Sequence, residues 1–242
     1  MRLDGRVALV TGAGRRLGRA MASALARRGM AVAIHYNASR EGAEALRAEI
    51  AAEGGRSACF GADLADAAAA RALPGRVAEE LGGLDVLVNS AAVMEHLRFE
   101  ETTVEQYDRI LDVNLRSAFF CTQGAAPFLR AAHGKVVNIA DLGGLEPWPG
   151  YAAHSVSKAG VVMLTKVLSL SLAPEVTVNA IAPGAVLVPD AYDQAERDRL
   201  ARTTPLARLG NPDDVVGALL YLLESDFVTG EVLAVDGGRL LR

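Results

Sequence analysis

The sequence has 242 residues, of which 51% are hydrophobic and 22% charged, and its formal net charge is −4. This length and apolar content suffice for one large domain with a single core. With this net negative charge, the protein lacks the positive potential that attracts nucleic acid or an anionic membrane surface. No run reaches the ~18 apolar residues of a membrane span. The first residues, MRLDGRVALV, lack the succession of charged, apolar and small residues that is typical of a secretory signal peptide. We therefore expect one domain over residues 1–242 in a cytoplasmic protein that binds neither nucleic acid nor membrane.

Seven short runs rich in valine and isoleucine predict strands. They cover residues 6–11, 30–36, 56–60, 84–89, 135–140, 176–182 and 231–236. Their apolar residues are continuous rather than alternating, as in strands covered on both faces. Segments with helical spacing alternate with them, at about 16–29, 40–53, 66–81, 104–131, 151–173 and 212–224. This order predicts an α/β fold with a doubly wound, Rossmann-like parallel sheet of seven strands.

The first predicted strand runs into a glycine-rich turn, TGAGRRLG, at the edge of the sheet where ligands of this fold bind. Gly12, Gly14 and Gly18 let the backbone turn tightly and approach a pyrophosphate, and the helix that follows offers free N–H groups. Their spacing differs from the GxGxxG fingerprint. A tight turn without a ligand is the alternative, but the strand before it and the helix after it favour a dinucleotide site.

The end of the second predicted strand indicates which dinucleotide binds. NAD sites place a carboxylate there, whereas sites for a 2′-phosphate use arginine. Residues 35–40, HYNASR, contain no carboxylate, and the turn carries Arg15 and Arg16. Arg15 could be a solvated cation, but at the start of a helix it opposes the dipole and favours a nearby anion. We predict NADP(H), with Asp63 either accepting from the adenine amino group or capping the next helix.

Six motifs resemble the short-chain dehydrogenase/reductase family over essentially the whole chain. They are TGAGRRLG, DVLVNSAA, DVNLRSAFF, YAAHSVSKAG, VNAIAPGAV and FVTGEVLAVDGG, similar to the family's TGxxxGxG turn, DxLVNNAG strand, helix asparagine, YxxSK helix, NxxxPG loop and C-terminal strand. Arg16, Asp141 and the ending VDGGRLLR resemble the pteridine reductase and dihydromonapterin reductase branch, which uses NADPH to reduce pterins.

The resemblance implies four catalytic roles. Asn114 fixes a water in a proton relay, Asp141 stands at the family's serine, and Lys158 matches the lysine that binds the nicotinamide ribose. His154 stands where the family has its tyrosine proton donor. Together with the turn chemistry, the resemblance assigns to the cofactor Gly12, Gly14, Arg15, Arg16, Leu17, Gly18, His35, Tyr36, Asn37, Ser39, Asp63, Leu64, Asn89, Lys158, Pro183 and Gly184.

Two departures from the branch weaken a pterin substrate. The branch commonly has an aromatic residue soon after the fourth strand, where this chain has Val93 and Met94, with no aromatic nearer than Phe99. Val186 and Val188 also stand where the family often has a hydroxyl that contacts the carboxamide.

Whether the protein is an active reductase depends on the chemistry of residue 154. Hydride transfer to a C=O or C=N bond leaves negative charge that a proton donor must neutralise. His154 and Lys158 project from one helix face, where the lysine disfavours an imidazolium and Asp141 favours it. Three interpretations remain open: His154 donates the proton while paired with Asp141, Tyr151 takes over this role, or the site has little or no reductase activity.

We favour an NADP(H)-dependent reductase of a small carbonyl or imine compound, with a pterin as one candidate. The alternative is a non-catalytic NADP(H)-binding sensor or scaffold. Residues 185–211 are expected to form a substrate lid, with a passive surface loop as the alternative. The resemblance also implies a homodimer or homotetramer built on the two long helices and the C-terminal strand. Cys59 and Cys121 are expected to be buried and reduced, and no histidines and acids have metal-site spacing.

Overall fold

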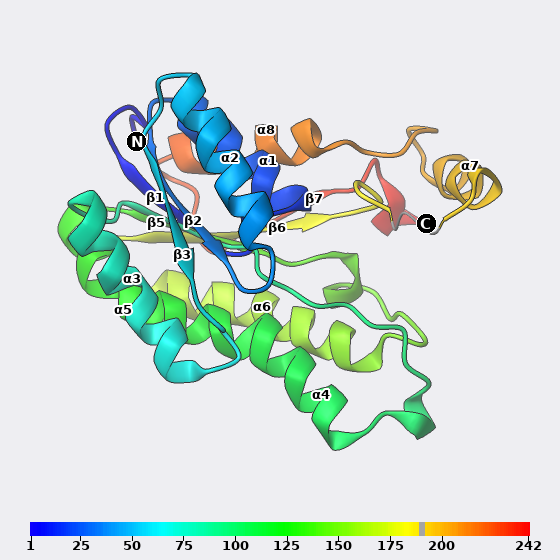
Figure 1. The fold of residues 1–242 in the computed structure, drawn as a ribbon. Coiled ribbons are helices and arrows are strands. Elements are labelled where there is room, and N and C mark those ends of the chain that lie inside the picture. The colour runs from blue at the N-terminus through cyan, green and yellow to red at the C-terminus, as the bar shows by residue number, and fades with distance from the viewer. Residues whose placement is uncertain (189–191) are drawn as a thin grey trace.

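Parallel strands form one sheet with helices on both faces (Figure 1). The computed structural model describes residues 1–188 and 192–242, and within them the strand order is β3-β2-β1-β4-β5-β6-β7. The strands are β1 (Val7–Val10), β2 (Ala31–Tyr36), β3 (Ser57–Gly61), β4 (Val86–Asn89), β5 (Lys135–Ile139), β6 (Thr177–Pro183) and β7 (Val232–Val235). The predicted doubly wound, seven-stranded α/β fold is confirmed.

The helices form two layers. One face carries α1 (Arg16–Arg27), α2 (Arg40–Ala52) and α8 (Pro212–Glu224). The other carries α3 (Ala67–Leu81), α5 (Ser117–Ala132) and α6 (Ala152–Ser171), with α4 (Val104–Leu111) beside α6. In β1, Ala8 and Val10 pack into the core of the first layer, whereas Val7 and Leu9 pack into that of the second. Burial on both faces is the reason why the strand sequences are continuously apolar.

The predicted helix at 104–131 is divided into α4 and α5 by a π-helical turn, η2 (Asp112–Arg116). Such turns insert an extra residue into a helix and occur often at functional sites. Here the turn carries Asn114, which is buried. The π-turn was not predicted, because one extra residue barely changes the spacing of the apolar positions.

A further helix, α7 (Gln194–Thr203), lies within the predicted lid. Asp193 caps it by accepting from the backbone N–H of Glu196, and the Glu196 side chain accepts from the N–H of Asp193 in return. Only Leu200 of this helix is buried. It therefore has no apolar stripe that sequence periodicity could detect.

The sheet changes its winding direction between β1 and β4. Val10, the last residue of β1, pairs with Ile34 of β2 on one side and with Val88 of β4 on the other. The chain leaves β1 toward the α1 layer and leaves β4 toward the α4 layer (Figure 1). A crevice at the carboxyl ends of β1 and β4 is where this fold binds ligands.

In the described ranges, the helices lack the combination of length and apolarity needed to cross a bilayer.

Both cysteines are free thiols. Cys121 is buried, as expected, but Cys59 is only half-buried. Burial raises the pKa of Cys121 to about 12 and that of Cys59 to about 11. Both thiols therefore stay protonated near neutral pH, which makes them poor nucleophiles.

Candidate active site

The glycine-rich turn between β1 and α1 packs closely on itself and on the segment after β4, so that two of its positions require glycine. Gly12 has a φ of +68°, and a Cβ there would lie 3.0 Å from Ala91 Cα. A Cβ on Gly18 would collide with the Gly12 carbonyl oxygen. Helix α1 starts with no acidic residue in its first turn and no side-chain cap, so its N–H groups are available to an anion. These features fit the pyrophosphate of a dinucleotide.

His35 holds this turn from behind. Its Nδ1 accepts from Gly12 N–H at 3.0 Å, and its Nε2 lies 3.1 Å from the carbonyl oxygen of Ala62, to which it donates. Burial lowers the pKa of His35 to about 4, so the ring is neutral and uses both nitrogens on the backbone. The structure thus places this residue as a support of the turn and of the end of β3.

The side chains at the end of β2 lie where the adenosine half would bind. Ser39 leaves the amino end of α2 uncapped and lies against Gly14. The exposed Asn37 amide donates to Asp63 Oδ1 at 3.3 Å. Arg15 is exposed, and no acidic side chain in the described ranges forms an ion pair with it. This cation is available to a phosphate.

Arg16 connects the turn to the start of the predicted lid. Its backbone is left-handed, with a φ of +51°, a conformation that glycine adopts more readily than arginine. Its guanidinium donates to the carbonyl oxygen of Leu187. The arginine thus spans the edge of the sheet from β1 to the segment after β6.

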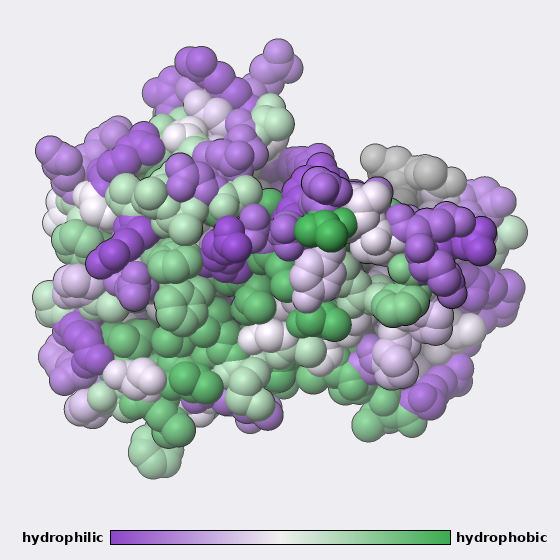
Figure 2. All heavy atoms as spheres, turned by 90° about the horizontal axis from the view of Figure 1, so that it is seen from below, coloured by the Kyte–Doolittle hydropathy of each residue, from purple (hydrophilic) through white to green (hydrophobic). Residues whose placement is uncertain are grey.

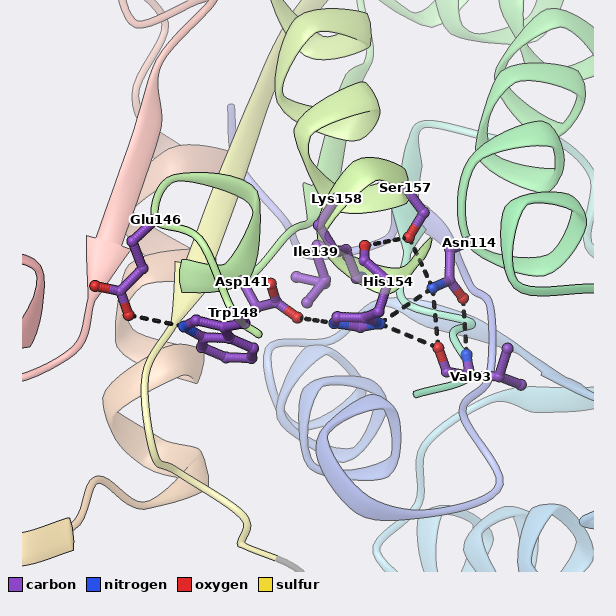
Figure 3. Close-up of polar contacts among 9 residues, drawn as sticks. All are labelled: Val93, Asn114, Ile139, Asp141, Glu146, Trp148, His154, Ser157 and Lys158. Carbon is purple, nitrogen blue, oxygen red and sulfur yellow. Dashed lines mark hydrogen bonds and ion pairs between the residues drawn. The ribbon is translucent and has the colours of Figure 1, made fainter. Parts of the chain in front are cut away.

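Asp141 and His154 form a pair at the carboxyl end of β5 (Figure 3). Nε2 of His154, in the first turn of α6, lies 2.5 Å from Asp141 Oδ2. The His154 side chain is 2% exposed and that of Asp141 18%. The other carboxylate oxygen, Oδ1, is buried without a hydrogen-bond partner in the protein. It is therefore the polar atom of this pair that can still receive a donor.

Asn114 anchors the opposite side of the imidazole. Its Oδ1 accepts from Val93 N–H at 2.8 Å, which fixes the orientation of the amide. Its Nδ2 then donates to Val93 O at 2.9 Å and to Ser157 Oγ at 3.0 Å. The Ser157 hydroxyl in turn donates to the carbonyl oxygen of His154 at 2.6 Å. The π-turn thus ties the segment after β4 to α6.

The hydrogen-bond partners of the His154 ring differ between its two nitrogens. Both amide hydrogens of Asn114 are already used, so none remains for Nδ1, which lies 3.4 Å away. That nitrogen is best satisfied by donating to Val93 O, at 3.3 Å. Nε2 also has to donate, because a lone pair facing the Asp141 carboxylate would be repelled. Nδ1 thus faces a backbone acceptor and Nε2 a carboxylate acceptor.

Lys158 lies one helical turn after His154 and is buried (Figure 3). Its Nζ donates to the carbonyl oxygen of Ile139 at 2.7 Å. Burial lowers the pKa of Lys158, and the nearby charge of Asp141 opposes this shift. The four predicted catalytic residues, Asn114, Asp141, His154 and Lys158, come together in one site.

Aromatic residues line the site beside this pair. Trp148 and Tyr151 meet edge to face, with ring centroids 6.1 Å apart, and Tyr151 meets His96 in the same manner at 5.1 Å. Burial raises the pKa of Tyr151, which makes its phenol a weaker acid than usual. Sequence reasoning identified neither Trp148 nor Ser157 as site residues. The only signal for Trp148 is a large aromatic between two prolines shortly before His154.

The remaining predicted cofactor residues fall into three groups. Asn89 is buried and donates to Thr122 Oγ1 and Asn138 Oδ1, at 3.1 and 2.8 Å, so it belongs to a polar network inside the protein. Pro183 ends β6 and Gly184 follows it, and a Cβ on Gly184 would lie 2.8 Å from Asp236 Cα. Leu17 and Tyr36 are half-buried and Leu64 is buried.

The predicted lid is described except for residues 189–191. Val186 is buried, whereas Val188 is half-buried. A cavity of about 450 Å³ lies between the two ends of this segment and β7, lined by residues such as Val186, Thr204 and Asp236. In the described part of the chain, no group of three histidines, cysteines or acids could hold a metal ion.

Comparisons with known proteins match this architecture. The family described as enoyl-(acyl carrier protein) reductase matches residues 12–239. The 3-oxoacyl-[acyl-carrier-protein] reductase FabG of Staphylococcus aureus is 37% identical, with 96% of each chain covered. A short-chain dehydrogenase/reductase of Serratia marcescens has a TM-score of 0.92 at 35% identity, with 99% of this chain and 100% of that one covered. This chain belongs to the short-chain dehydrogenase/reductase family.

Another solved member of the family is also similar. FolM alternative dihydrofolate reductase 1 of Brucella canis, complexed with NADP, has a TM-score of 0.94 at 30% identity, with 100% of this chain and 96% of that one covered. As a short-chain dehydrogenase/reductase, the protein is an NAD(P)-dependent oxidoreductase.

Proposed function

We propose that the protein is an NADPH-dependent reductase of a small carbonyl or imine compound in which the His154 imidazolium donates the proton. The observation that carries this proposal is the 2.5 Å contact between His154 Nε2 and Asp141 Oδ2. A carboxylate this close stabilises the charged ring, which is the acid form that the reaction requires. Asp141 and His154 thus act as a coupled pair.

The preference for NADP(H) is supported by the charges around the adenosine end. Arg15 has no acidic partner in the described part of the chain, and residues 35–40 contain no carboxylate that would repel a 2′-phosphate. Arg16 adds a second cation on the same turn. The FolM structure, which contains NADP, is consistent with this preference.

Each residue of the site has a distinct task in the proposed reaction. NADPH, when bound at this site, would supply the hydride for the carbon of the C=O or C=N bond. His154 Nε2 and Asp141 Oδ2 hold a proton between them, and in the proposed step this proton passes to the heteroatom that gains the negative charge, leaving a neutral imidazole and a carboxylate. Asp141 orients the ring and stabilises its charge, while Asn114 keeps Val93 O at Nδ1. Once Nε2 has lost its proton, its lone pair faces the carboxylate, which favours rapid reprotonation.

Lys158 has a role at the cofactor in this proposal. Its buried ammonium is held by Ile139 O at the end of β5, where the nicotinamide ribose would lie. The Lys158 ammonium is buried and has no carboxylate of the described residues in direct contact, so it can form strong, charge-assisted hydrogen bonds to the ribose hydroxyls. A pterin is one candidate substrate, in line with the resemblance of Arg16 and Asp141 to the pteridine reductase branch.

Consumption of NADPH and NADH, measured across pH with dihydropterins, quinones and small ketones, tests this proposal. We expect turnover with NADPH of at least one of these substrates. Tight NADPH binding without turnover of any substrate would instead support the non-catalytic alternative. The His154→Phe variant should bind NADPH as the wild type does and show no turnover, whereas full activity would remove His154 from the mechanism.

We also propose that the protein is a homodimer or homotetramer. Figure 2 shows hydrophobic side chains gathered on the face that carries α4, α5 and α6. Phe119 is 44% exposed, Met163 58% and Leu170 82%. Apolar area of this kind is typical of an association surface. Light scattering should give a multiple of the chain mass, and Met163→Glu should lower it; a monomeric wild type would contradict the proposal.

A further inference from the structure

Trp148 is the only tryptophan of the chain, and it lies in the loop between Asp141 and His154. Its side chain is half-buried. The indole Nε1–H donates to Glu146 Oε1 at 2.8 Å, within the same loop. Because the polar atom of the indole is satisfied locally, the rest of the ring can present an apolar surface to the site.

The plane of the indole is nearly parallel to that of the imidazole. The rings of Trp148 and His154 are inclined by only 11°, with centroids 6.4 Å apart. Stacked rings in direct contact are separated by about 3.5–4 Å, so this longer centroid distance means that the two rings are displaced sideways. Figure 3 shows them side by side, with Asp141 between them. The two nearly parallel rings thus lie on either side of Asp141.

The orientation of this indole is fixed by its neighbours. A Cβ on Gly143 would lie 2.9 Å from Trp148 Cε3, so the indole packs closely on a position that only glycine leaves open. Tyr151 packs against the indole edge to face, with ring planes inclined by 71°. Glu146 holds its nitrogen. A ring fixed on three sides loses little conformational entropy when a ligand stacks on it.

We propose that Trp148 is a specificity-determining residue whose indole, next to His154, forms a platform for a planar conjugated substrate. A flat ring, such as a quinone or an unsaturated nitrogen heterocycle, would stack on the indole with its C=O or C=N bond directed toward His154. A flexible aliphatic ketone covers the platform poorly and loses more freedom on binding. This inference rests on the proposed reductase function and specifies its substrate class.

The single tryptophan makes the platform directly observable. With NADP⁺ bound, which does not absorb the tryptophan emission, phenanthrenequinone should quench the fluorescence of Trp148 in a saturable manner. Ethyl acetoacetate, a small aliphatic ketone, should not quench it at equal concentration. The Glu146→Ala variant, which frees the indole, should weaken the saturable quenching, whereas Glu146→Gln keeps an acceptor for Nε1–H and should preserve it. Absence of saturable quenching in the wild type would overturn the inference.

Kinetics of Trp148 variants provide the second measurement. Trp148→Leu keeps an apolar side chain but removes the flat surface, so KM for phenanthrenequinone should rise about tenfold while kcat changes less than about twofold. Trp148→Phe retains an aromatic ring and should recover most of this loss. KM for ethyl acetoacetate and the affinity for NADPH should stay within about twofold in both variants. Equal losses for both substrate classes would indicate a merely structural residue and overturn the inference.

The two proposals can fail separately. Saturable quenching of Trp148 without turnover of any substrate would contradict the reductase and leave the platform in place. Turnover of phenanthrenequinone that is unchanged in Trp148→Leu would support the reductase and overturn the platform.

Discussion

The buried His154 pairs with the half-buried Asp141, with 2.5 Å between carboxylate oxygen and Nε2, at the positions where the family resemblance places a tyrosine and a serine. A tyrosine is a weak acid that needs a neighbouring cation to act near neutral pH, whereas an imidazolium is already acidic enough. What the imidazolium needs is a neighbouring anion. The two departures from the family pattern therefore compensate each other chemically.

Removing the charge of Asp141 tests this compensation. In Asp141→Asn, the amide can still accept from Nε2, but it no longer stabilises the charged ring, so kcat should fall about 100-fold. The affinity for NADPH should change less than about twofold, because the carboxylate does not bind the cofactor in the proposal. Steady-state kinetics and a fluorescence titration of NADPH measure the two quantities. An unchanged kcat would show that the pair has no part in proton transfer.

Replacing His154 with the family's tyrosine should change the pH dependence of the reaction. The phenol has an ordinary pKa of about 10 and keeps its proton at a higher pH than an imidazolium does. His154→Tyr should therefore retain measurable reduction that persists at alkaline pH, where wild-type activity has declined. His154→Phe is the matched control, because phenylalanine has the ring of tyrosine but no hydroxyl proton to donate. Superimposable pH profiles of wild type and His154→Tyr would indicate a different proton donor, with Tyr151 the first candidate.

The strands could be predicted from the sequence to within about two residues, because burial on both faces of the sheet leaves continuous apolar runs. Helix α7 could not, since Leu200 is its only buried residue and its stability comes from the capping box at Asp193. The π-turn at Asn114 could not be predicted from the sequence either. Its extra residue alters the direction of one side chain without changing the amphipathic pattern around it.

The candidate site was predictable where motifs identify residues, and not where packing decides their role. Asn114, Asp141, His154 and Lys158 come together as predicted. His35 was expected among the cofactor residues, but its ring lies behind the turn with both nitrogens bonded to the backbone. The direction of a side chain at the end of a fully buried strand does not follow from the sequence. Trp148 was missed because a half-buried aromatic in a loop has no periodic signal.

Protonation of His35 should make stability depend on pH. The pKa of His35 is about 4 in the folded protein and about 6.5 in the unfolded chain, so the neutral ring favours folding fully above pH 6.5. As pH falls from about 6.5 to about 4, the unfolded chain takes up a proton that the folded protein excludes. This difference should remove up to about 3 kcal/mol of stability.

Urea unfolding between about pH 7 and about pH 4.5 measures this loss. His35→Asn is the matched variant, because its side-chain oxygen can accept from Gly12 N–H and does not titrate. It should be less stable than the wild type at neutral pH, since the bond to Ala62 is lost, and its stability should decline less on acidification. Parallel declines in both proteins would assign the acid sensitivity to other groups.

Arg16 should show opposite effects on stability and on cofactor affinity. Its left-handed backbone, with a φ of +51°, costs about 1 kcal/mol in an arginine and little in glycine. Arg16→Gly should therefore make the cofactor-free protein more stable, but by at most about 0.5 kcal/mol once the greater freedom of glycine in the unfolded chain is subtracted. NADPH affinity should fall about tenfold, since a cation near the phosphates is lost. Arg15 is the control, because its backbone is extended, with a φ of −156°. Arg15→Gly should lower both stability and affinity, and an Arg16→Gly variant that binds NADPH as tightly as the wild type would exclude Arg16 from the cofactor site.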